Sequence, residues 1–279
     1  MTNHTAAAEP RAAAASLRAD LPVMLAVAAV AILGRLPVLG AWWALDDWGL
    51  LARAAGQLEP ETGVPARWLS QHLWWSVTWP LFGLSADAQA VLRLALHAGS
   101  ALLVVRLAVR AGLEPPARLL AGLVFAATPL AFTPLYWAAG VQELLAAVGA
   151  LGAVAGFTAG RRGALLWGTL LALAAIAAKE AALGLPVLLA AILVFESPGA
   201  RPRADRPLAW ALVLFLALAA VLEARLVLDH FATGSDDPYR LGGAVTVLGN
   251  LGVFGFWLVS PGPVFASELS WPMVGGGGA

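Results

Sequence analysis

The sequence contains no cysteine and few charged residues. The absence of cysteine excludes disulfides, thiolate nucleophiles and cysteine-ligated metals. Charged residues make up only 12% of the chain, whereas a soluble domain carries about a quarter. The net charge is zero, which gives no general attraction to nucleic acid. The sequence also lacks a glycine-rich phosphate loop, a histidine pair with metal-binding spacing and a serine nucleophile elbow.

Apolar residues, in contrast, make up 60% of the chain and occur in long blocks. A helix needs about 20 apolar residues to cross a bilayer. Leucine and alanine dominate the blocks, which favours helices over the alternating strands of membrane barrels. We therefore predict an all-α, polytopic membrane helix bundle of about eight spans, at residues 21–40, 88–109, 118–137, 142–160, 164–178, 181–195, 207–228 and 243–260.

The distribution of arginines predicts the orientation of these spans. Short cytoplasmic loops are enriched in lysine and arginine. With the N-terminus in the cytoplasm, the inside segments contain Arg11, Arg18, Arg106, Arg110, Arg118, Arg161, Arg162, Arg201, Arg203 and Arg206. The outside segments then contain most acidic residues. We expect a multi-pass protein of the inner (plasma) membrane, with residues 1–20 as a loose cytoplasmic tail and an uncleaved first helix.

The segment 41–87 is the longest one predicted between spans, and it lies outside. Seven of the twelve tryptophans fall between Trp42 and Trp79. Tryptophan prefers the membrane–water interface, where its ring is buried and its N–H group stays hydrated. We expect short amphipathic helices that lie on the outer membrane surface.

An acidic pair, Asp46 and Asp47, directly follows the first predicted span. Carboxylates are costly in the bilayer centre, so the pair should lie at or above the outer interface. There the carboxylates could accept a proton from a hydroxyl, or bind a divalent cation through oxygen. The alternative is a solvated pair that only ends the helix.

A second feature is Lys179, the only lysine in the chain, beside Glu180 in a tight outer turn. An ammonium close to the membrane can bind a phosphate as a compact charge. Three arginines near the outer ends of spans, Arg35, Arg93 and Arg225, could complete a ring around a lipid phosphate. Alternatively, each arginine snorkels or pairs locally, as Arg225 could with Glu223.

Three further residues support this candidate site. Glu143 opens a predicted helix on the outside, where capping is the default role. His97 lies inside the second span and is expected to be a hydrogen-bonded packing residue rather than a ligand. Trp48 directly follows the acidic pair.

Together these positions resemble the GT-C superfamily of membrane glycosyltransferases, in particular its protein O-mannosyltransferase-like branch, which includes the transmembrane–tetratricopeptide O-mannosyltransferases. Three stretches carry the resemblance: Asp46-Asp47-Trp48, residues 119–145 with Phe125, Pro129, Trp137 and Gly140-Val-Gln-Glu143, and Ala178-Lys179-Glu180 with Pro186. Members of this family usually have more helices and a C-terminal external domain. The resemblance therefore implies that residues 21–279 form a GT-C-like transmembrane domain that is incomplete at its C-terminus.

The resemblance implies an enzyme of the cell envelope that acts in protein glycosylation. It would move a sugar, hexosyl or mannosyl, from a polyprenyl-phosphate donor to a protein or glycan acceptor outside the membrane. Asp46 or Asp47 would be the base, and Lys179 with the outer arginines would hold the donor phosphate. Some members use a divalent metal such as Mg²⁺ or Mn²⁺, for which Asp46 or Asp47 would be the ligand. The main alternative is a transporter or flippase for a lipid or small solute, although transporters place charges near the midplane and show inverted repeats.

Overall fold

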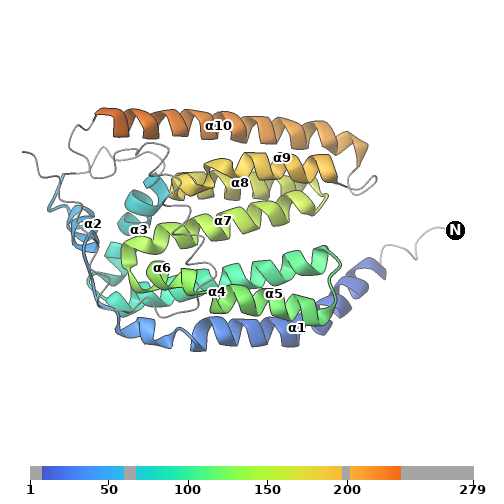
Figure 1. Ribbon diagram of the computed structural model, residues 1–279, viewed down its shortest axis with the longest axis horizontal. Helices are drawn as coiled ribbons and strands as arrows, with labels where there is room; N and C mark the ends of the chain where they lie inside the picture. The colour runs from blue at the N-terminus through green and yellow to red at the C-terminus, as the bar shows by residue number, and fades with distance from the viewer. Residues whose placement is uncertain (1–7, 60–66, 197–201, 234–279) are drawn as a thin grey trace, which may run out of the picture. The chain divides into compact units, whose positions relative to one another are not determined.

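In the computed structural model, the described part of the chain comprises residues 8–59, 67–196 and 202–233. This part contains helices joined by short loops and no strands (Figure 1). It contains five helical segments that are long and apolar enough to cross a membrane: Asp20–Gly40, Ala86–Arg110, Pro115–Tyr136, Ala138–Thr158 and Arg206–Asp229. The predicted helical class is therefore confirmed, and the apolar helices indicate a membrane-associated protein.

The predicted number of about eight spans is not confirmed. The spans predicted at 164–178 and 181–195 are apolar helices, α8 (Arg162–Ala178) and α9 (Leu185–Phe195), but they have only 17 and 11 residues. Both are shorter than the length of about 20 residues that crosses a bilayer. The span predicted at 243–260 lies outside the described residues.

The first helix, α1 (Ala8–Leu33), begins well before the predicted span and continues through the short 3₁₀ turn η1 (Leu36–Gly40). Residues 8–20, expected to be loose, are therefore helical. Alanine-rich sequence favours this extension, because alanine has the highest helix propensity. The side chains of α1 pack with α4 (Ala86–Arg110) and α5 (Pro115–Ala127) around Val27, Ala31 and Ala101.

The third span, predicted as one helix at 118–137 in which Pro129 and Pro134 can cause kinks, is interrupted in the structure. Helix α5 ends at Ala127, and Thr128 has extended backbone. Two short turns follow: η4 (Pro129–Ala131) and α6 (Phe132–Tyr136). Proline cannot donate a helical hydrogen bond and disfavours helical geometry in the preceding residue, so Pro129 and Pro134 explain the interruption.

Helix α7 (Val141–Thr158) packs closely against α8. Small residues allow membrane helices to approach closely. A Cβ atom added at Gly156 would lie 2.6 Å from the Cα of Gly168, and one at Gly149 would lie 2.7 Å from the carbonyl oxygen of Leu171. Apolar side chains of α7, α8, α9 and α10 (Arg206–Thr233) share one buried cluster, which includes Leu165, Leu189 and Leu216.

Contacts between helix ends define two ends of this bundle. At one end Arg118 pairs with Asp20, and Arg162 pairs with Asp205 in the turn η7 (Arg203–Asp205) before α10. The opposite end carries α2 (Asp47–Ala54), the π-helical turn η3 (Trp68–Leu73) and α3 (Trp74–Phe82), as Figure 1 shows. The candidate site residues Asp47, Glu143 and Lys179 lie at this second end.

Candidate functional site

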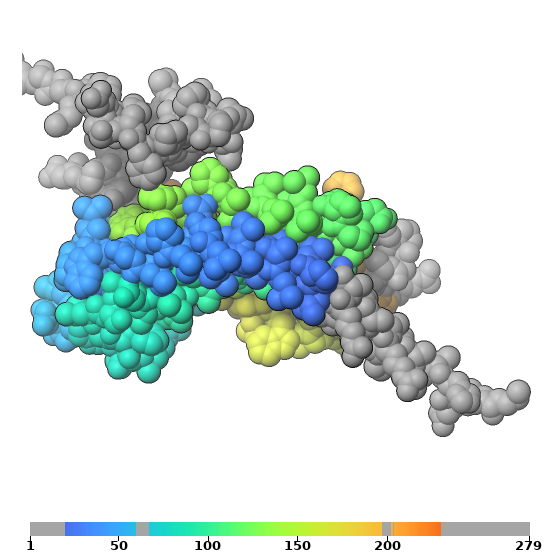
Figure 2. All heavy atoms as spheres, turned by 90° about the horizontal axis from the view of Figure 1, so that it is seen from below, coloured from blue at the N-terminus to red at the C-terminus, as the bar shows by residue number. Residues whose placement is uncertain are grey.

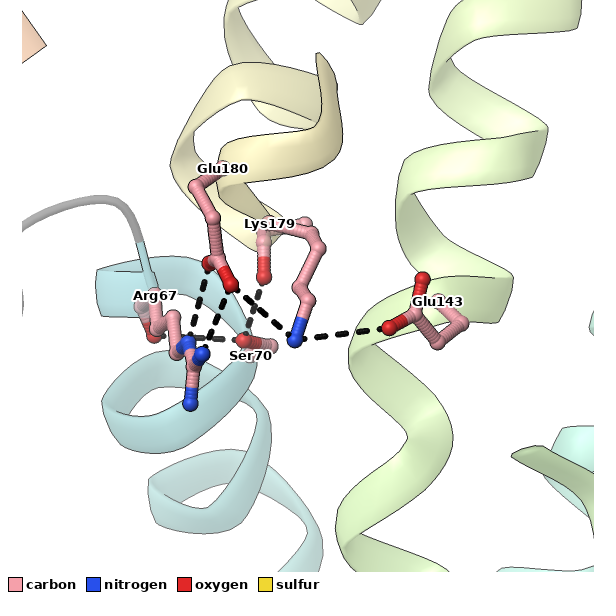
Figure 3. A network of polar contacts seen from close by, with 6 residues as sticks. Arg67, Ser70, Glu143, Lys179 and Glu180 are labelled. Carbon is pink, nitrogen blue, oxygen red and sulfur yellow. Dashed lines mark hydrogen bonds and ion pairs between the residues drawn. The ribbon is translucent and has the colours of Figure 1, made fainter. Parts of the chain in front are cut away.

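Four charged side chains from three separate segments form one ion network (Figure 3). The guanidinium of Arg67 donates two hydrogen bonds to the carboxylate of Glu180, from Nε to Oε2 at 3.0 Å and from Nη2 to Oε1 at 2.7 Å. The ammonium of Lys179 lies 3.2 Å from Glu180 Oε1 and 3.3 Å from Glu143 Oε1. The lysine thus bridges the two carboxylates, and Glu180 bridges the two cations.

The backbone positions this network at the end of α8. The helix stops at Ala178, Lys179 adopts extended backbone with φ −160° and ψ 136°, and the 3₁₀ turn η6 (Glu180–Gly184) follows. The hydroxyl of Ser70 in η3 donates to the carbonyl of Ala178 at 2.7 Å and so satisfies one carbonyl of the helix end. Arg67, three residues before Ser70, is thereby held beside the turn that carries Glu180.

The two carboxylates around Lys179 differ in exposure. The side chain of Lys179 is 14% exposed and that of Glu180 29%, whereas that of Glu143 is 46% exposed. Glu143 lies in the first turn of α7, where the helix dipole favours a negative charge. Two cations face two carboxylates, so these four described side chains together carry no net charge. Glu143 is its most accessible carboxylate.

The adjacent aspartates of the acidic pair have different environments. Asp47 is fully buried, and its two carboxylate oxygens accept hydrogen bonds from the backbone N–H of Ala44 at 2.9 Å and of Ala139 at 2.6 Å. Burial raises the pKa of Asp47, although these N–H groups and the charge of Arg93 act in the opposite direction. Asp46 is exposed. Of this pair, only Asp46 presents a carboxylate to an incoming molecule.

A continuous series of contacts joins the acidic pair to the ion network. Asp47 binds the backbone of Ala139 in the turn η5 (Ala138–Gly140), which leads directly into α7. Glu143 follows Ala139 by four residues, about one helical turn. The segment after the first span and the start of α7 are thus fixed to each other, and Glu143 links both to Lys179.

Arg35, Arg93 and His97 contact the interrupted span rather than the ion network. Arg35 donates to the carbonyls of Ala127 and Thr128 at 3.1 and 2.7 Å, and Arg93 Nε donates to that of Leu135 at 2.9 Å. His97 Nε2 lies 3.0 Å from the carbonyl of Ala126.

These three side chains contact carbonyl groups of the residues around the break in the helix and of the short helix after it. Such partners are required where backbone polar groups are removed from water. His97 also stacks on Phe125, which agrees with its expected packing role. The contacts explain why two arginines and a histidine are placed in apolar spans without invoking a ligand.

Two other predicted site residues, Arg225 and Trp48, take no part in the ion network or in the contacts with the interrupted span. Arg225 is 81% exposed on α10, and its Nε lies 4.0 Å from Asp229 one turn further on, not beside the expected partner Glu223. Trp48 lies on α2 with about half of its surface exposed. In the described residues the structure therefore brings Lys179, Glu180 and Glu143 together, and it does not add Arg35, Arg93 or Arg225 to them.

Whether the acidic pair can bind the expected metal ion depends on which of its carboxylate oxygens are available. Both oxygens of Asp47 are used by backbone N–H groups, so only Asp46 has free carboxylate oxygens. Among the described residues, no three histidine or acidic side chains lie together in a way that could hold a metal ion. A resident Mg²⁺ or Mn²⁺ usually needs carboxylates in addition to water or phosphate ligands. The arrangement does not fit a resident metal held by both aspartates.

Sequence reasoning missed Arg67 and Ser70. Arg67 lies among the tryptophans of the external segment, where no helix pattern or motif marks it. The need for a second cation becomes visible only in the structure, where Lys179 lies beside carboxylates from two segments.

Comparison with known proteins adds no relative: no family model, no curated protein and no solved structure matches this chain. The class of the protein therefore rests on its own features. These are apolar helices long enough to cross a membrane and a polar network at one end of them.

Proposed function

We propose that this chain is a membrane glycosyltransferase of the GT-C type. It would transfer a sugar from a polyprenyl-phosphate donor to a protein or glycan acceptor on the extracytoplasmic face of the plasma membrane. The observation that carries the proposal is the connection of an exposed carboxylate, Asp46, through Asp47 and the start of α7, to the ammonium of Lys179. Such a transfer needs a base for the acceptor and a cation for the donor phosphate at the same membrane surface.

The two aspartates would then have separate roles. Asp46 accepts the proton of the acceptor hydroxyl, because it is the exposed member of the pair. Asp47 is a positioning residue, because its oxygens hold the backbone of the external segment against Ala139. Lys179 binds the donor phosphate, and Glu180 with Arg67 holds the lysine in place.

The reaction would proceed in one displacement. The acceptor oxygen attacks the anomeric carbon and forms the new glycosidic bond while its proton passes to Asp46. The bond between this carbon and the phosphate oxygen breaks, and its electron pair leaves with the polyprenyl phosphate. Lys179 stabilises the negative charge that develops on this oxygen. Attack opposite to the leaving group inverts the configuration of the sugar carbon.

The distribution of charge between the two ends supports the proposed orientation. Arg110, Arg118 and Arg162 lie at the end away from the ion network, where they contact Ala155, Asp20 and Asp205. Cytoplasmic helix ends are enriched in arginine. The ion network then faces the extracytoplasmic side, where the polyprenyl phosphate would present its sugar.

A transporter or flippase receives less support. Transport sites usually place charged groups near the middle of the membrane. Two of the ionisable residues that lie inside the described spans, Arg93 and His97, contact carbonyls of the interrupted helix. The groups with exposed surface lie at the helix ends instead.

The proposal is tested with membranes that contain the chain and radiolabelled polyprenyl-phosphate sugars. Loss of label from the lipid is compared for the wild type, Asp46→Asn, Lys179→Ala and Lys179→Arg. Asp205→Asn is the matched control, because it also removes a paired charge but lies at the opposite end. The level of folded protein is measured for each variant by detergent extraction and size-exclusion chromatography.

We expect turnover in the wild type and in Asp205→Asn, its loss in Asp46→Asn and Lys179→Ala, and partial retention in Lys179→Arg. Turnover that persists in Asp46→Asn and Lys179→Ala would contradict the roles assigned to these residues. Absence of turnover in folded wild type, with transfer of a labelled lipid between leaflets instead, would favour the flippase.

A further inference from the structure

The external segment exposes large apolar side chains at the end that carries the ion network. Eight of the described ones are at least half exposed or nearly so, including Leu58 and Leu84. We call the following six the apolar rim: Trp42 (67%), Leu45 (79%), Trp48 (49%), Trp68 (53%), Val77 (52%) and Leu81 (66%). They come from the segment before α2, from α2 itself, from η3 and from α3. In water, such a concentration of exposed apolar surface is unfavourable and marks an interaction surface.

The external segment has a hydrophobic core of its own, so the exposure of the apolar rim does not reflect the lack of a core. Trp43 and Trp75 are almost completely buried and pack against each other with their ring centroids 6.1 Å apart. Leu50 and Leu51 of α2 are buried in the same cluster. Each part of the segment therefore buries one apolar face and leaves another exposed. Leu45 is exposed on strained backbone, with φ of 47°, which is uncommon for a bulky residue.

The rim continues the apolar surface of the adjoining spans. Leu33 and Leu36, at the end of the first span, are 63% and 43% exposed, and Val91 at the start of α4 is 54% exposed. Trp42 follows the first span after one residue, and Leu81 lies five residues before α4. In Figure 2 the surfaces of α1 and of the segment that follows it run on without a break toward α3.

We propose that the apolar rim is inserted into the outer leaflet of the membrane, with lipid as its partner. Three of its six members are tryptophans, whose rings favour the headgroup boundary. Continuity with the exposed surface of the spans distinguishes lipid from a separate protein partner, because the same layer of lipid that covers Leu33 and Val91 reaches the rim. The proposal does not depend on the chain being a glycosyltransferase.

Insertion of the apolar rim would fix the depth of the ion network relative to the outer leaflet of the membrane. Trp68 directly follows Arg67, whose guanidinium holds Glu180 and through it Lys179. If Trp68 lies in the leaflet, Lys179 lies at the level of the lipid headgroups and not in the water above them. A ligand with a phosphate on a lipid chain would then reach Lys179 from within the leaflet.

The absence of cysteine makes the test clean, because a single cysteine can be introduced and labelled anywhere. The variants are Trp68→Cys and Leu81→Cys on the rim. Gln57→Cys, exposed in the loop after α2, is the aqueous control, and Leu214→Cys, 67% exposed within α10, is the control for the membrane interior. Each purified chain is labelled with a polarity-sensitive fluorophore and placed in vesicles of phosphatidylcholine and phosphatidylglycerol.

Quenching by iodide in the water is compared with quenching by nitroxide lipids that carry the spin label near or far from the headgroup. We expect rim labels to be quenched about twofold more by the shallow nitroxide than by the deep one, and weakly by iodide. Leu214→Cys should respond to the deep nitroxide and Gln57→Cys to iodide. Rim labels that respond to iodide as Gln57→Cys does, or that neither quencher reaches because protein covers them, would overturn the proposal.

Discussion

The guanidinium of Arg67 lies against the carboxylate of Glu180 with two parallel hydrogen bonds, at 3.0 and 2.7 Å. This pair joins the external segment to the turn between α8 and α9 across more than 110 residues of sequence. Both side chains are less than one third exposed. The paired geometry is the one in which arginine binds a carboxylate most strongly.

A double-mutant cycle should reveal coupling between Arg67 and Glu180. We expect a coupling free energy of unfolding of about 1 kcal/mol from Arg67→Ala, Glu180→Ala and the double variant, measured by thermal unfolding in detergent. The control cycle uses Arg225 and Asp229, which are mostly exposed and 4.0 Å apart. Its coupling should be close to zero. Equal coupling in the two cycles would contradict the difference that the geometry predicts.

Replacing Glu143 should strengthen binding of the proposed donor. In Glu143→Gln, Lys179 loses the more exposed of its two carboxylates, so an incoming phosphate no longer competes with it. We expect the KM for the lipid donor to fall about two- to fivefold, because an exposed ion pair contributes up to about 1 kcal/mol.

Glu114→Gln is the matched control for this change, because Glu114 also lies at a helix start but precedes α5 at the opposite end. Its KM should equal that of the wild type. A higher KM in Glu143→Gln would show that Glu143 positions Lys179 instead of competing with the phosphate.

Substitution of Asp47 should lower the stability of the fold, whereas substitution of Asp46 should lower transfer activity alone. Asp47→Ala leaves the buried N–H groups of Ala44 and Ala139 without their carboxylate partner, so we expect a loss of about 1–3 kcal/mol in the free energy of unfolding. Asp46→Ala removes an exposed side chain and should change stability by less than about 0.5 kcal/mol while transfer activity is lost. Thermal unfolding and the turnover assay measure both effects. A large loss of stability in Asp46→Ala would show a structural role.

The contact between α7 and α8 should be sensitive to one added methyl group. In Gly156→Ala the new Cβ would meet the backbone of Gly168, which has to move because no flexible side chain is involved. We expect a loss of about 1–3 kcal/mol, as for overpacked sites. Gly99→Ala, in the middle of α4 with open space around it, should be neutral or stabilise by up to about 1 kcal/mol. Equal unfolding temperatures for the two variants would contradict the close approach of the helices.

The sequence predicted much of the helical architecture, since apolar composition is a local property. Arg106, Arg110 and Arg118 mark helix ends in the sequence and lie at helix ends in the structure. The interruption at Thr128 was underestimated, although Pro129 and Pro134 were visible. A proline inside an apolar run is compatible with either a kink or a break.

The candidate site was predicted only in part. Lys179, Glu180 and Glu143 were singled out, but Arg67 was not, because its importance comes from a partner 113 residues away. For Arg35 and Arg93 the sequence leaves a phosphate and a local partner open, because arginines in apolar spans need a partner. In the structure both donate to carbonyls of the interrupted helix.

The sequence by itself determined that this chain forms apolar helices with charged residues at their ends, because the length and hydropathy of a segment decide whether it can cross a bilayer. Only the tertiary structure decided which of two adjacent aspartates is buried and which is exposed. It also decided that Lys179 lies between two carboxylates from different helices. These properties depend on which backbone N–H groups and side chains meet in space, and residues that are distant in sequence supply them.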